Sequence, residues 1–376
     1  MRIGIDARNL VPKLSGIGRY VVETSRHLAA LGHEVFAYLP SPPHSEEAIP
    51  PGVHSDVSHH NGALARIWWG NTSLLKLAKH DHIDVLWGPA HRLPVLGTST
   101  IPAVLTIHDL VWRHASDTMR SLGWLGERVF MERSIRMADR VVAVSSATEA
   151  AVAAAYPWAR HKTSVVYPGC TPLAKVSDED VFRRADITRP FVLFVGTLEP
   201  RKNLNGLLRA FAMLPDQLRS ELQLVIAGGQ GWGLNDLQTE ISRLEIAELV
   251  RLTGFVSDAE LGTLYRRARF LAMPSYYEGF GLPIIEANAA GIPVLTSESS
   301  SMPEVGGDAA LLVDPSSVRS ITHGLERLIA DTNLYHRLQQ AAAANAARFD
   351  WAKSARELSV VFEQTMQLSK KQGATR

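Results

Sequence analysis

The chain has 376 residues, more than one ordinary hydrophobic core organises, so we expect two domains of roughly 150 to 200 residues each. Hydrophobic residues make up 46% and charged residues 20%, which is typical of a folded globular protein and argues against disorder. Because 39 Lys and Arg residues are balanced by 38 Asp and Glu residues, no overall positive field would hold nucleic acid, and we expect no nucleic-acid partner.

The single cysteine, Cys170, excludes an internal disulfide and a cysteine-based metal cluster, which favours a reducing compartment. Asp6 and Arg8 stand where a signal peptide would need apolar residues, and the sequence has no run of about 18 apolar residues. We therefore expect a cytoplasmic protein without a membrane-spanning helix.

Short apolar runs alternate with helical patterns along the chain. The first half has predicted strands at 2–7, 34–39, 83–88, 103–109, 140–145 and 162–169. After a polar stretch, the second half has predicted strands at 191–197, 222–229, 250–255, 269–275 and 293–299. This alternation predicts the α/β class, with two Rossmann-like domains that each wrap helices around a parallel sheet.

The domain boundary is expected near 170–190, where Pro168, Gly169, Pro172 and an acidic cluster interrupt the pattern. We therefore divide the chain into an N-terminal domain at 1–172 and a C-terminal domain at 173–351. A last helix at about 352–376 comes too late to start another strand–helix unit, and we expect it to pack back on the first domain.

A glycine pair, Gly16 and Gly18, lies between the first strand and a helical pattern that runs to about Leu31. Glycine lets the backbone approach a ligand, and the free N–H groups of a helix start attract anions. Val21 stands where a dinucleotide fingerprint needs its third glycine, and no strand immediately precedes the pair, which disfavours a nicotinamide oxidoreductase. A ligand-binding loop and a plain turn both stay open.

Two cations, Arg201 and Lys202, follow the predicted strand 191–197 and directly precede a helical pattern. Open parallel sheets bind ligands outside the carboxyl ends of their strands, and the helix start adds partial positive charge. This pattern predicts an anion site, for which a diphosphate is the natural ligand. The alternative is a solvated Arg–Lys pair, which is less favourable because cations are repelled at that end of a helix.

The segment 278–287, EGFGLPIIEA, again joins a strand end to a helix start. The N–H groups of Gly281 and Leu282 can face a phosphate, while Glu278 and Glu286 can accept hydrogen bonds from sugar hydroxyls. The alternative makes Glu278 an ordinary loop acid and Glu286 an acid on a helix surface.

Together, GTLEPRKN at 196–203 and EGFGLPIIEA at 278–287 resemble the motifs of the large retaining GT-B glycosyltransferase family (family 4-like), which includes many bacterial mannosyltransferases. The resemblance covers nearly the whole chain and is best in the C-terminal half. It implies two Rossmann-like domains that face each other across a cleft. By this likeness Arg201 and Lys202 neutralise the leaving diphosphate, Glu286 holds the ribose, and Glu278 contacts hydroxyls of the transferred sugar.

The resemblance also implies donor contacts along several loops. Phe255 and Val256 are expected beside the base. The other expected donor-binding positions are Gly16, Gly18, Gly196, Gly279, Phe280, Gly281 and Leu282.

His108 lies at the carboxyl end of the predicted strand 103–109, is expected to face the cleft, and resembles the family histidine that contacts the donor sugar. From the residues alone a structural role is the commoner one, and Asp109 beside it could simply cap the following turn. The family context favours the donor-contacting role.

Asp178, Glu179 and Asp180 form the one Asp-x-Asp motif of the sequence, a pattern that can hold a metal-bound diphosphate. They follow Ser177 in the predicted linker and fit a helix start better, because acids are favourable there. With Arg201 and Lys202 present, we expect no metal and no cofactor besides the nucleotide-sugar donor.

Residues 119–140 mix arginines with large apolar side chains. The arginines are Arg120, Arg128, Arg133, Arg136 and Arg140, and the apolar residues include Trp124, Leu125, Val129, Phe130 and Met131. A basic amphipathic helix can lie on an anionic membrane, which would place the protein at the inner face of the cytoplasmic membrane. The alternative is a helix that packs on its own sheet with a solvated basic face.

These features predict transfer of a hexose, preferably mannose from GDP-mannose, to a saccharide or lipid-linked acceptor in polysaccharide or lipopolysaccharide biosynthesis. Retention of anomeric configuration is implied by the family only. The alternatives are a glycosyltransferase that uses a UDP-sugar, a sugar-nucleotide hydrolysing epimerase on the same fold, and a non-catalytic sugar-nucleotide sensor. A P-loop NTPase is disfavoured because G-x-x-x-x-G-K-[ST] does not occur.

Overall fold

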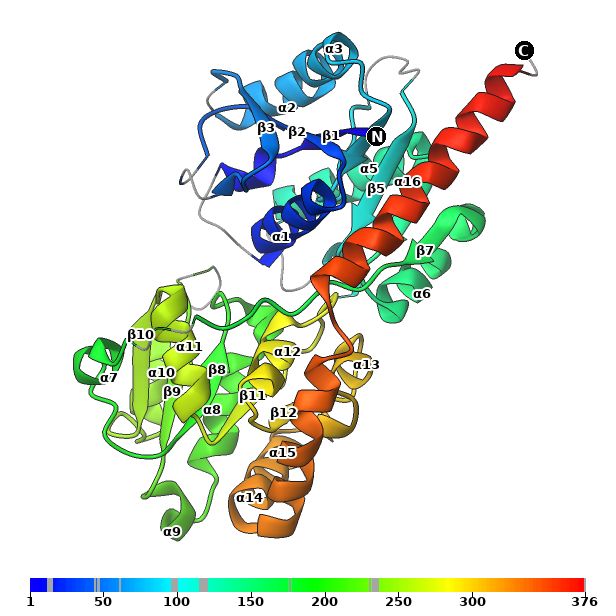
Figure 1. Ribbon diagram of the computed structural model, residues 1–376. Coiled ribbons are helices and arrows are strands. Elements are labelled where there is room, and N and C mark those ends of the chain that lie inside the picture. Colours follow the sequence, from blue (N-terminus) through cyan, green and yellow to red (C-terminus); the bar gives the residue numbers. More distant parts are fainter. Residues whose placement is uncertain are drawn as a thin grey trace. The chain divides into compact units, whose positions relative to one another are not determined.

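The computed structural model describes residues 1–11, 16–43, 45, 48–60, 62–95, 101–114, 121–174, 176, 178–229, 231 and 237–374, with only the backbone for 63–64, 114, 121–128 and 371–374. The chain divides into two compact units (Figure 1). The first contains Met1–Trp112, Arg120–Gly169 and Asp350–Arg376, and the second is formed mainly by Cys170–Phe349. Each unit is described by itself.

The first unit contains a seven-stranded parallel sheet with strand order β3-β2-β1-β4-β5-β6-β7. The strands are β1 (Arg2–Asp6), β2 (Glu34–Leu39), β3 (Val53–Val57), β4 (Val85–Gly88), β5 (Ala103–Ile107), β6 (Arg140–Ala143) and β7 (Thr163–Val165). The helices are α1 (Gly16–Ala30), α2 (Ala63–Asn71), α3 (Ser73–His80), α4 (Val111–His114), α5 (Ser121–Met137), α6 (Ser146–Ala155) and α16 (Trp351–Ala374), with 3₁₀ turns at Arg8–Leu10 and Pro157–Lys162.

The C-terminal helix α16 belongs to the first unit and packs beside α1 (Figure 1). Its start is fixed by a close approach of two chain segments: a Cβ atom on Gly169 would lie 2.3 Å from the backbone nitrogen of Trp351, so only glycine fits there. The hydroxyl of Ser354 donates to the carbonyl of Tyr167 in the same region. These contacts attach the last helix to the segment that leaves β7.

The second unit contains a six-stranded parallel sheet with order β10-β9-β8-β11-β12-β13, the doubly wound arrangement. The strands are β8 (Phe191–Val195), β9 (Gln223–Ala227), β10 (Val250–Gly254), β11 (Phe270–Met273), β12 (Val294–Ser297) and β13 (Ala310–Val313). The helices are α7 (Asp180–Arg184), α8 (Leu204–Ala212), α9 (Asp216–Arg219), α10 (Leu237–Arg243), α11 (Asp258–Arg267), α12 (Leu282–Ala289), α13 (Met302–Gly306), α14 (Val318–Ala330) and α15 (Thr332–Ala346), with 3₁₀ turns at Pro200–Lys202 and Gly307–Ala309.

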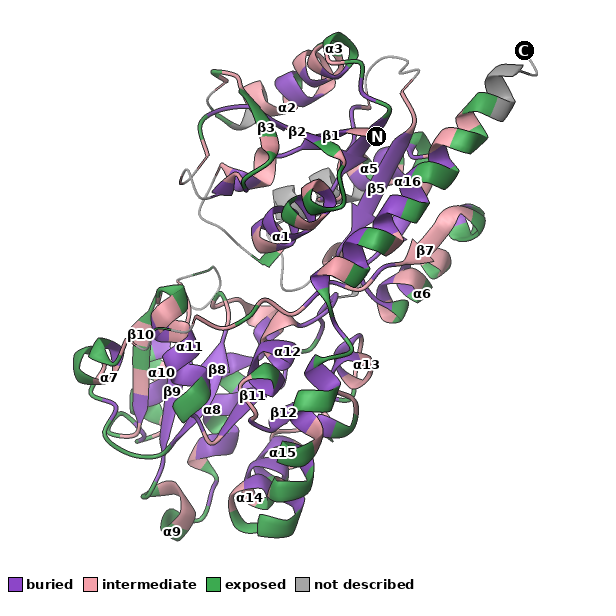
Figure 2. Cartoon of the chain, viewed as in Figure 1, coloured by how far each residue is buried: buried purple, intermediate pink, exposed green. Residues whose placement is uncertain are grey.

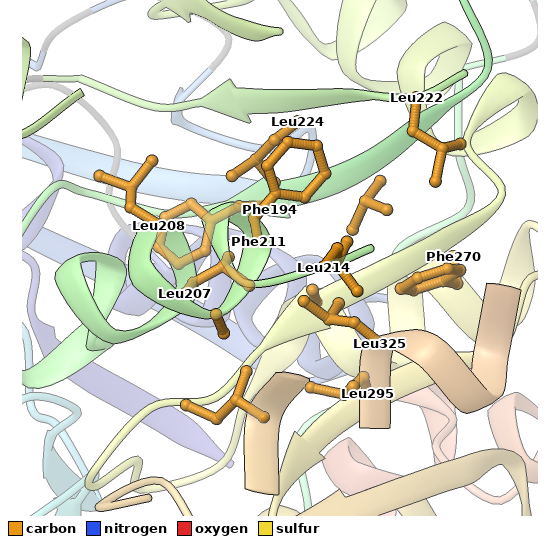
Figure 3. Packing of buried hydrophobic residues seen from close by; sticks show 14 of the residues in the cluster. Phe194, Leu207, Leu208, Phe211, Leu214, Leu222, Leu224, Phe270, Leu295 and Leu325 are labelled. Carbon is orange, nitrogen blue, oxygen red and sulfur yellow. The ribbon is translucent and has the colours of Figure 1, made fainter. Parts of the chain in front are cut away.

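The central strands of this second sheet are covered on both faces. Every residue of β8, β9 and β11 is buried (Figure 2), which explains why these strands, apart from Gln223, are continuous apolar runs and not alternating patterns. Phe194 of β8, Phe211 of α8 and Phe270 of β11 pack together with surrounding leucines in one core cluster (Figure 3). The well-packed sheet supports the loops that leave its carboxyl edge.

Helix α5 covers most of the predicted basic amphipathic segment. In its described part Met131 and Ile135 are buried in the core of the first unit, while Arg133 and Arg136 are exposed. This half of the helix therefore packs on its own sheet and keeps a basic outer face. Arg120 and the side chains of Trp124, Leu125 and Arg128 lie outside the described residues. Over the described part of the chain, no helix combines the length and the apolar composition that crossing a membrane requires.

Candidate active site

Three loops leave neighbouring strands of the second sheet at the same edge. β11 pairs with β8 on one side and with β12 on the other, all parallel, so the segments after Val195, Met273 and Ser297 start side by side. Ligands of open α/β sheets bind outside the carboxyl ends of strands. Arg201 and Lys202 lie on the first of these loops and Glu278 on the second, while Glu286 lies on the helix that follows the second loop.

The structure brings together three of the predicted residues in one ion-pair cluster. Glu278 lies between two cations: its Oε2 atom is 2.6 Å from Nη1 of Arg201, and its Oε1 atom is 2.5 Å from Nζ of Lys202. The hydroxyl of Ser275 donates to the same Oε1 at 3.0 Å, and Nε of Arg201 also lies 2.9 Å from Oε2 of Glu199. Arg201 and Lys202 therefore meet two carboxylates in the described structure.

The cluster is largely withdrawn from water. The side chain of Lys202 is 9% exposed, that of Glu278 8% and that of Arg201 19%. Burial alone would raise the pKa of Glu278, but Arg201 and Lys202 outweigh burial and lower this pKa to about 2. Burial lowers the pKa of Lys202, and Glu278 partly opposes that shift. The alternative of a solvated Arg–Lys pair is thus wrong, and Glu278 is no ordinary loop acid.

The backbone around the two cations differs from the expected direct entry into a helix. Pro200, Arg201 and Lys202 form a 3₁₀ turn, Asn203 takes a left-handed conformation at φ 56°, and α8 begins only at Leu204. The Asn203 side chain stabilises this turn by donating to the carbonyls of Pro274 and Pro315 at 3.0 and 2.7 Å. The extra turn carries the cations over to the neighbouring loop instead of leaving them at the helix start.

Gly196 provides the space through which the Lys202 side chain passes. A Cβ atom built on Gly196, whose φ is 149°, would lie 3.3 Å from Cε of Lys202. Glycine at this position therefore has a structural reason: a Cβ atom would crowd the buried Lys202 side chain, and φ 149° is unfavourable for other residues.

Glu286 lies on α12, one turn and a half beyond the loop that carries Glu278. It is buried, and its Oε2 atom accepts a hydrogen bond from the hydroxyl of the fully buried Tyr265 at 2.9 Å. The alternative of an acid on a helix surface is therefore wrong. The sequence offered no signal for Tyr265, because it lies on another helix, α11, and its contact with Glu286 depends on how the two helices pack.

The remaining donor-site candidates of the second unit lie at the same edge of the sheet. Gly279, Phe280 and Gly281 are buried, Leu282 begins α12, and Gly281 caps this helix with φ 104°. Phe280 packs edge-on against Phe349, with 5.3 Å between ring centres. These residues fix the helix start whose N–H groups were expected to face a phosphate.

Phe255 and Val256 follow β10, two strands away from β8 in the sheet order. Phe255 is 65% exposed, which is unusual for a phenylalanine, and Val256 is half-buried. An exposed aromatic ring at the carboxyl edge of a parallel sheet is suited to stack on a base. Their contact with a base stays a prediction.

His108 lies in the first unit, directly after β5. Its Nε2 atom lies 2.7 Å from the carbonyl oxygen of Pro89, and because a carbonyl accepts, the proton is on Nε2 and the lone pair on Nδ1. Burial, assisted by His91, lowers the pKa of His108 to about 3, so the ring is neutral.

The His108 ring is held by its contact with Pro89 and by Tyr20 of α1, which packs edge-on against it with 4.9 Å between ring centres. The backbone N–H of His108 donates to Nε2 of His91 at 2.9 Å. Gly16 and Gly18 form the first turn of this same helix, so they begin the helix and do not form the loop before it. The sequence had no signal for the roles of His91 and Tyr20.

The acidic motif at 178–180 acts as a helix start. Asp180 begins α7 and pairs with Arg183, Asp178 accepts from the backbone N–H of Asp180 at 3.1 Å, and Glu179 lies 3.7 Å from Arg267. These contacts agree with the expected helix start, in which acids are favourable.

Comparison with known proteins links this geometry to a family. A family model described as glycosyl transferases group 1 matches residues 177–345, and a model described as glycosyltransferase family 4 matches residues 14–172. O-antigen chain mannosyltransferase B from Escherichia coli is 39% identical over 161 residues, which cover 43% of this chain and 42% of that protein. The matched region thus spans less than half the length of that relative.

Two further comparisons cover most of the chain. D-inositol 3-phosphate glycosyltransferase from Streptomyces avermitilis is 30% identical over 392 residues, covering 94% of this chain and 83% of that protein. Anabaena Alr3699/HepE, solved in complex with UDP and glucose, superposes with a TM-score of 0.75 at 21% identity, covering 97% of this chain and 100% of that one. The predicted GT-B fold class with two parallel-sheet α/β domains is confirmed. The chain belongs to the glycosyltransferases of group 1 and family 4.

Proposed function

We propose that this glycosyltransferase moves mannose from GDP-mannose to a saccharide or lipid-linked acceptor in polysaccharide or lipopolysaccharide assembly, with retention of configuration. The observation that carries the proposal is the buried cluster of Arg201, Lys202 and Glu278 at the carboxyl edge of the second sheet. It places two cations and a carboxylate where open α/β sheets bind their ligands.

The two cations suit a diphosphate leaving group. When the bond from the sugar to the diphosphate breaks, negative charge grows on the diphosphate. Arg201 and Lys202, held by the 3₁₀ turn, then stabilise the transition state more than the bound donor. We propose that these fixed positive charges replace a metal ion, so that the reaction requires no metal and no further cofactor.

The acids suit the sugars at either end of the diphosphate. In the proposal Glu286, oriented by Tyr265, holds the ribose, and Glu278 accepts hydrogen bonds from hydroxyls of the transferred sugar. His108, a neutral ring with its lone pair on Nδ1, contacts the donor sugar from the first unit. We assign no residue as a covalent nucleophile.

Mannose is supported by the relative whose name states that sugar. O-antigen chain mannosyltransferase B matches part of this chain at 39% identity. The structural neighbour solved with UDP and glucose favours the alternative of a UDP-sugar donor. A sugar-nucleotide hydrolysing epimerase and a non-catalytic sensor stay as further alternatives.

Calorimetric titration with GDP, UDP and ADP tests the base. We expect GDP to bind at least about tenfold more tightly than the other two, a difference of about 1.4 kcal/mol. Tighter UDP binding would overturn the choice of GDP-mannose. Product analysis with the sugar nucleotide alone separates the enzyme alternatives, because an epimerase would release free sugar without an acceptor and a sensor would release none.

Contact with an anionic membrane is a separate proposal, supported by the exposed Arg133 and Arg136 on α5. Flotation with vesicles that contain an anionic lipid tests it, with neutral vesicles as the control. Protein that stays at the bottom of the gradient with both vesicles would contradict peripheral attachment.

A further inference from the structure

Side-chain hydroxyls of one segment hold almost the whole loop that carries Glu278. The loop 274–281 joins β11 to α12, and the segment 296–301 runs from the end of β12 to the start of α13. Five residues of this segment make hydrogen bonds to backbone atoms at or beside the loop: Thr296 to Met273 O, Ser297 to Ser275 O, Ser299 to Tyr276 O, Ser301 to Glu278 O and Phe280 O, and Ser300 from Glu278 N.

The loop lies outside the helices and strands, so these side-chain hydrogen bonds take the place of a regular backbone hydrogen-bond pattern. A buried backbone group without a partner costs about 1 to 3 kcal/mol, so each hydroxyl fixes the conformation of the backbone carbonyl or N–H that it meets. Thr296, Ser297 and Ser301 are fully buried, and their distances to the loop carbonyls lie between 2.5 and 2.9 Å. Water is therefore not in a position to take over these contacts.

Both backbone polar groups of Glu278, its N–H and its carbonyl, are held by hydroxyls of this segment. Its backbone N–H donates to the Ser300 hydroxyl at 3.0 Å, and its carbonyl accepts from Ser301 at 2.9 Å. Ser300 makes this contact from a left-handed conformation at φ 51°, which is rare for a residue with a Cβ atom. Such a backbone conformation persists only where its surroundings require it.

We propose that Thr296, Ser297, Ser299, Ser300 and Ser301, called here the hydroxyl ladder, are positioning residues that hold the Glu278 carboxylate between Arg201 and Lys202. The ladder also directs the loop carbonyls toward itself and so away from an incoming anion. Its effect on turnover rests on the proposed function, because it takes Glu278 as the group that contacts the transferred sugar.

The ladder acts at the point where small errors matter most. A displacement of about 1 Å in a reacting site can cost about a hundredfold in rate, whereas the same displacement elsewhere costs stability alone. Removal of one buried hydroxyl of the ladder should therefore reduce turnover far more than removal of an equally buried hydroxyl elsewhere in this unit.

Ser301→Ala is the main test, and Thr322→Val is its matched control. Thr322 is buried in the same unit, and its hydroxyl donates to the carbonyl of Ala210 in a neighbouring helix, as Ser301 does to the loop. We expect Ser301→Ala to lower kcat about ten- to a hundredfold with KM changed less than about threefold. Thr322→Val should leave kcat within about twofold at a similar loss of thermal stability.

A double-mutant cycle with Glu278→Gln shows whether the ladder acts through Glu278. In the Glu278→Gln background, Ser301→Ala should lower kcat by less than about twofold, and the shifts in urea midpoint should not add. Additivity in either measurement would overturn the proposal. Ser300→Gly is the second variant, because it removes a hydroxyl but keeps the left-handed backbone, and it should reproduce the kcat loss.

The cycle separates failure of the ladder from failure of the proposed function. The urea midpoints need no substrate, so additive midpoints overturn the ladder even if the donor is misidentified. If the wild type turns over a UDP-sugar and not GDP-mannose, the proposed donor fails, and the same kcat cycle is measured with that UDP-sugar.

Discussion

The ammonium nitrogen of Lys202 lies 2.5 Å from Oε1 of Glu278, and both side chains are buried. The guanidinium of Arg201 occupies the other oxygen of the same carboxylate. With Glu199 also paired to Arg201, the formal charges of the two acids and the two cations cancel. A diphosphate that approaches these cations must therefore compete with Glu278.

Glu278→Gln tests this competition. The variant removes the competing negative charge but keeps the shape of the side chain, so we expect GDP, which has no sugar, to bind about tenfold more tightly. Turnover of the sugar nucleotide should fall by about a hundredfold, because the proposed sugar contact is lost. Calorimetry with GDP and initial-rate measurements check the two effects.

A matched control for this variant is Glu240→Gln. Glu240 lies on α10 of the same unit and pairs with Arg209 and Arg243, outside the loops that carry Arg201, Lys202 and Glu278. The Glu240→Gln variant should change neither GDP binding nor turnover. Weaker GDP binding by Glu278→Gln than by the wild type would mean that Glu278 supports the diphosphate instead of competing with it.

Arg201→Ala and Lys202→Ala should each lower turnover about tenfold to several hundredfold. Each removes a cation whose charge-assisted bond to the leaving diphosphate is expected to contribute about 1.5 to 3 kcal/mol. Arg209→Ala is the control, since Arg209 also pairs with a carboxylate but on the outer face of α8. Rates within twofold of the wild type for either site variant would contradict the assignment of the diphosphate site.

The lowered pKa of Glu278 predicts an acid-dependent loss of stability. Burial would raise this pKa, but Arg201 and Lys202 lower it to about 2, below the ordinary value of about 4.5. A carboxyl with a lowered pKa in the folded state contributes stability that is complete above about pH 4.5 and lost as the pH falls toward 2. The contribution is about 3 kcal/mol in the free energy of unfolding.

Urea unfolding of the wild type and Glu278→Gln at pH 5, 4 and 3 measures this contribution. The free energy of unfolding of the wild type should fall more steeply over this range than that of the variant. The difference between the two proteins removes the contributions of all other acids. Parallel pH dependences would show that Glu278 is not held as an ion pair in solution.

The sequence predicted the fold well wherever strands are buried on both faces. The runs that became β8 and β11 are continuously apolar, and that of β9 is apolar after Gln223, so their strands were correctly placed. β3 was missed because its sequence, VHSDV, is polar and lies at an exposed sheet edge. β13 was also missed; it lies at an edge of the second sheet, and only Val313 of its four residues is buried.

The residues of the site were predicted from the sequence, but the ion pairs between them were not. Arg201, Lys202 and Glu278 stood out because charged residues followed predicted strands, yet the ion pairs join residues 76 and 77 positions apart. No local spacing reports such a contact, since it depends on the register of β11 against β8. The serine-rich run 296–301 was visible in the sequence, but its meaning depends on which loop the adjacent strand places beside it.

The His108 ring should stay neutral across the physiological range. Burial and the neighbouring His91 lower its pKa to about 3, and Nε2 carries the proton that is donated to Pro89. Because the His108 imidazole of the unfolded chain takes up a second proton near pH 6.5, the folded protein should lose stability as the pH falls from about 6.5 toward 3. Nitrogen NMR of the imidazole should show one unchanged tautomer, with Nδ1 unprotonated, from pH 5 to 8. An inflection of the His108 signals within that range would contradict the neutral ring.

Tyr265→Phe should weaken donor binding without slowing the chemical step. The variant keeps the buried ring but removes the hydroxyl that donates to Glu286 at 2.9 Å, so Glu286 loses an orienting partner. If Glu286 holds the ribose, the loss affects ground state and transition state alike, and KM for the sugar nucleotide should rise about three- to tenfold with kcat nearly unchanged.

Tyr335→Phe is the matched control, because the Tyr335 hydroxyl donates to the carbonyl of Arg269 at 2.9 Å at the opposite end of β11. Equal effects of the two variants on KM would mean that Tyr265 only stabilises the unit, whereas a fall in kcat for Tyr265→Phe would move Glu286 from nucleotide binding to the reacting centre.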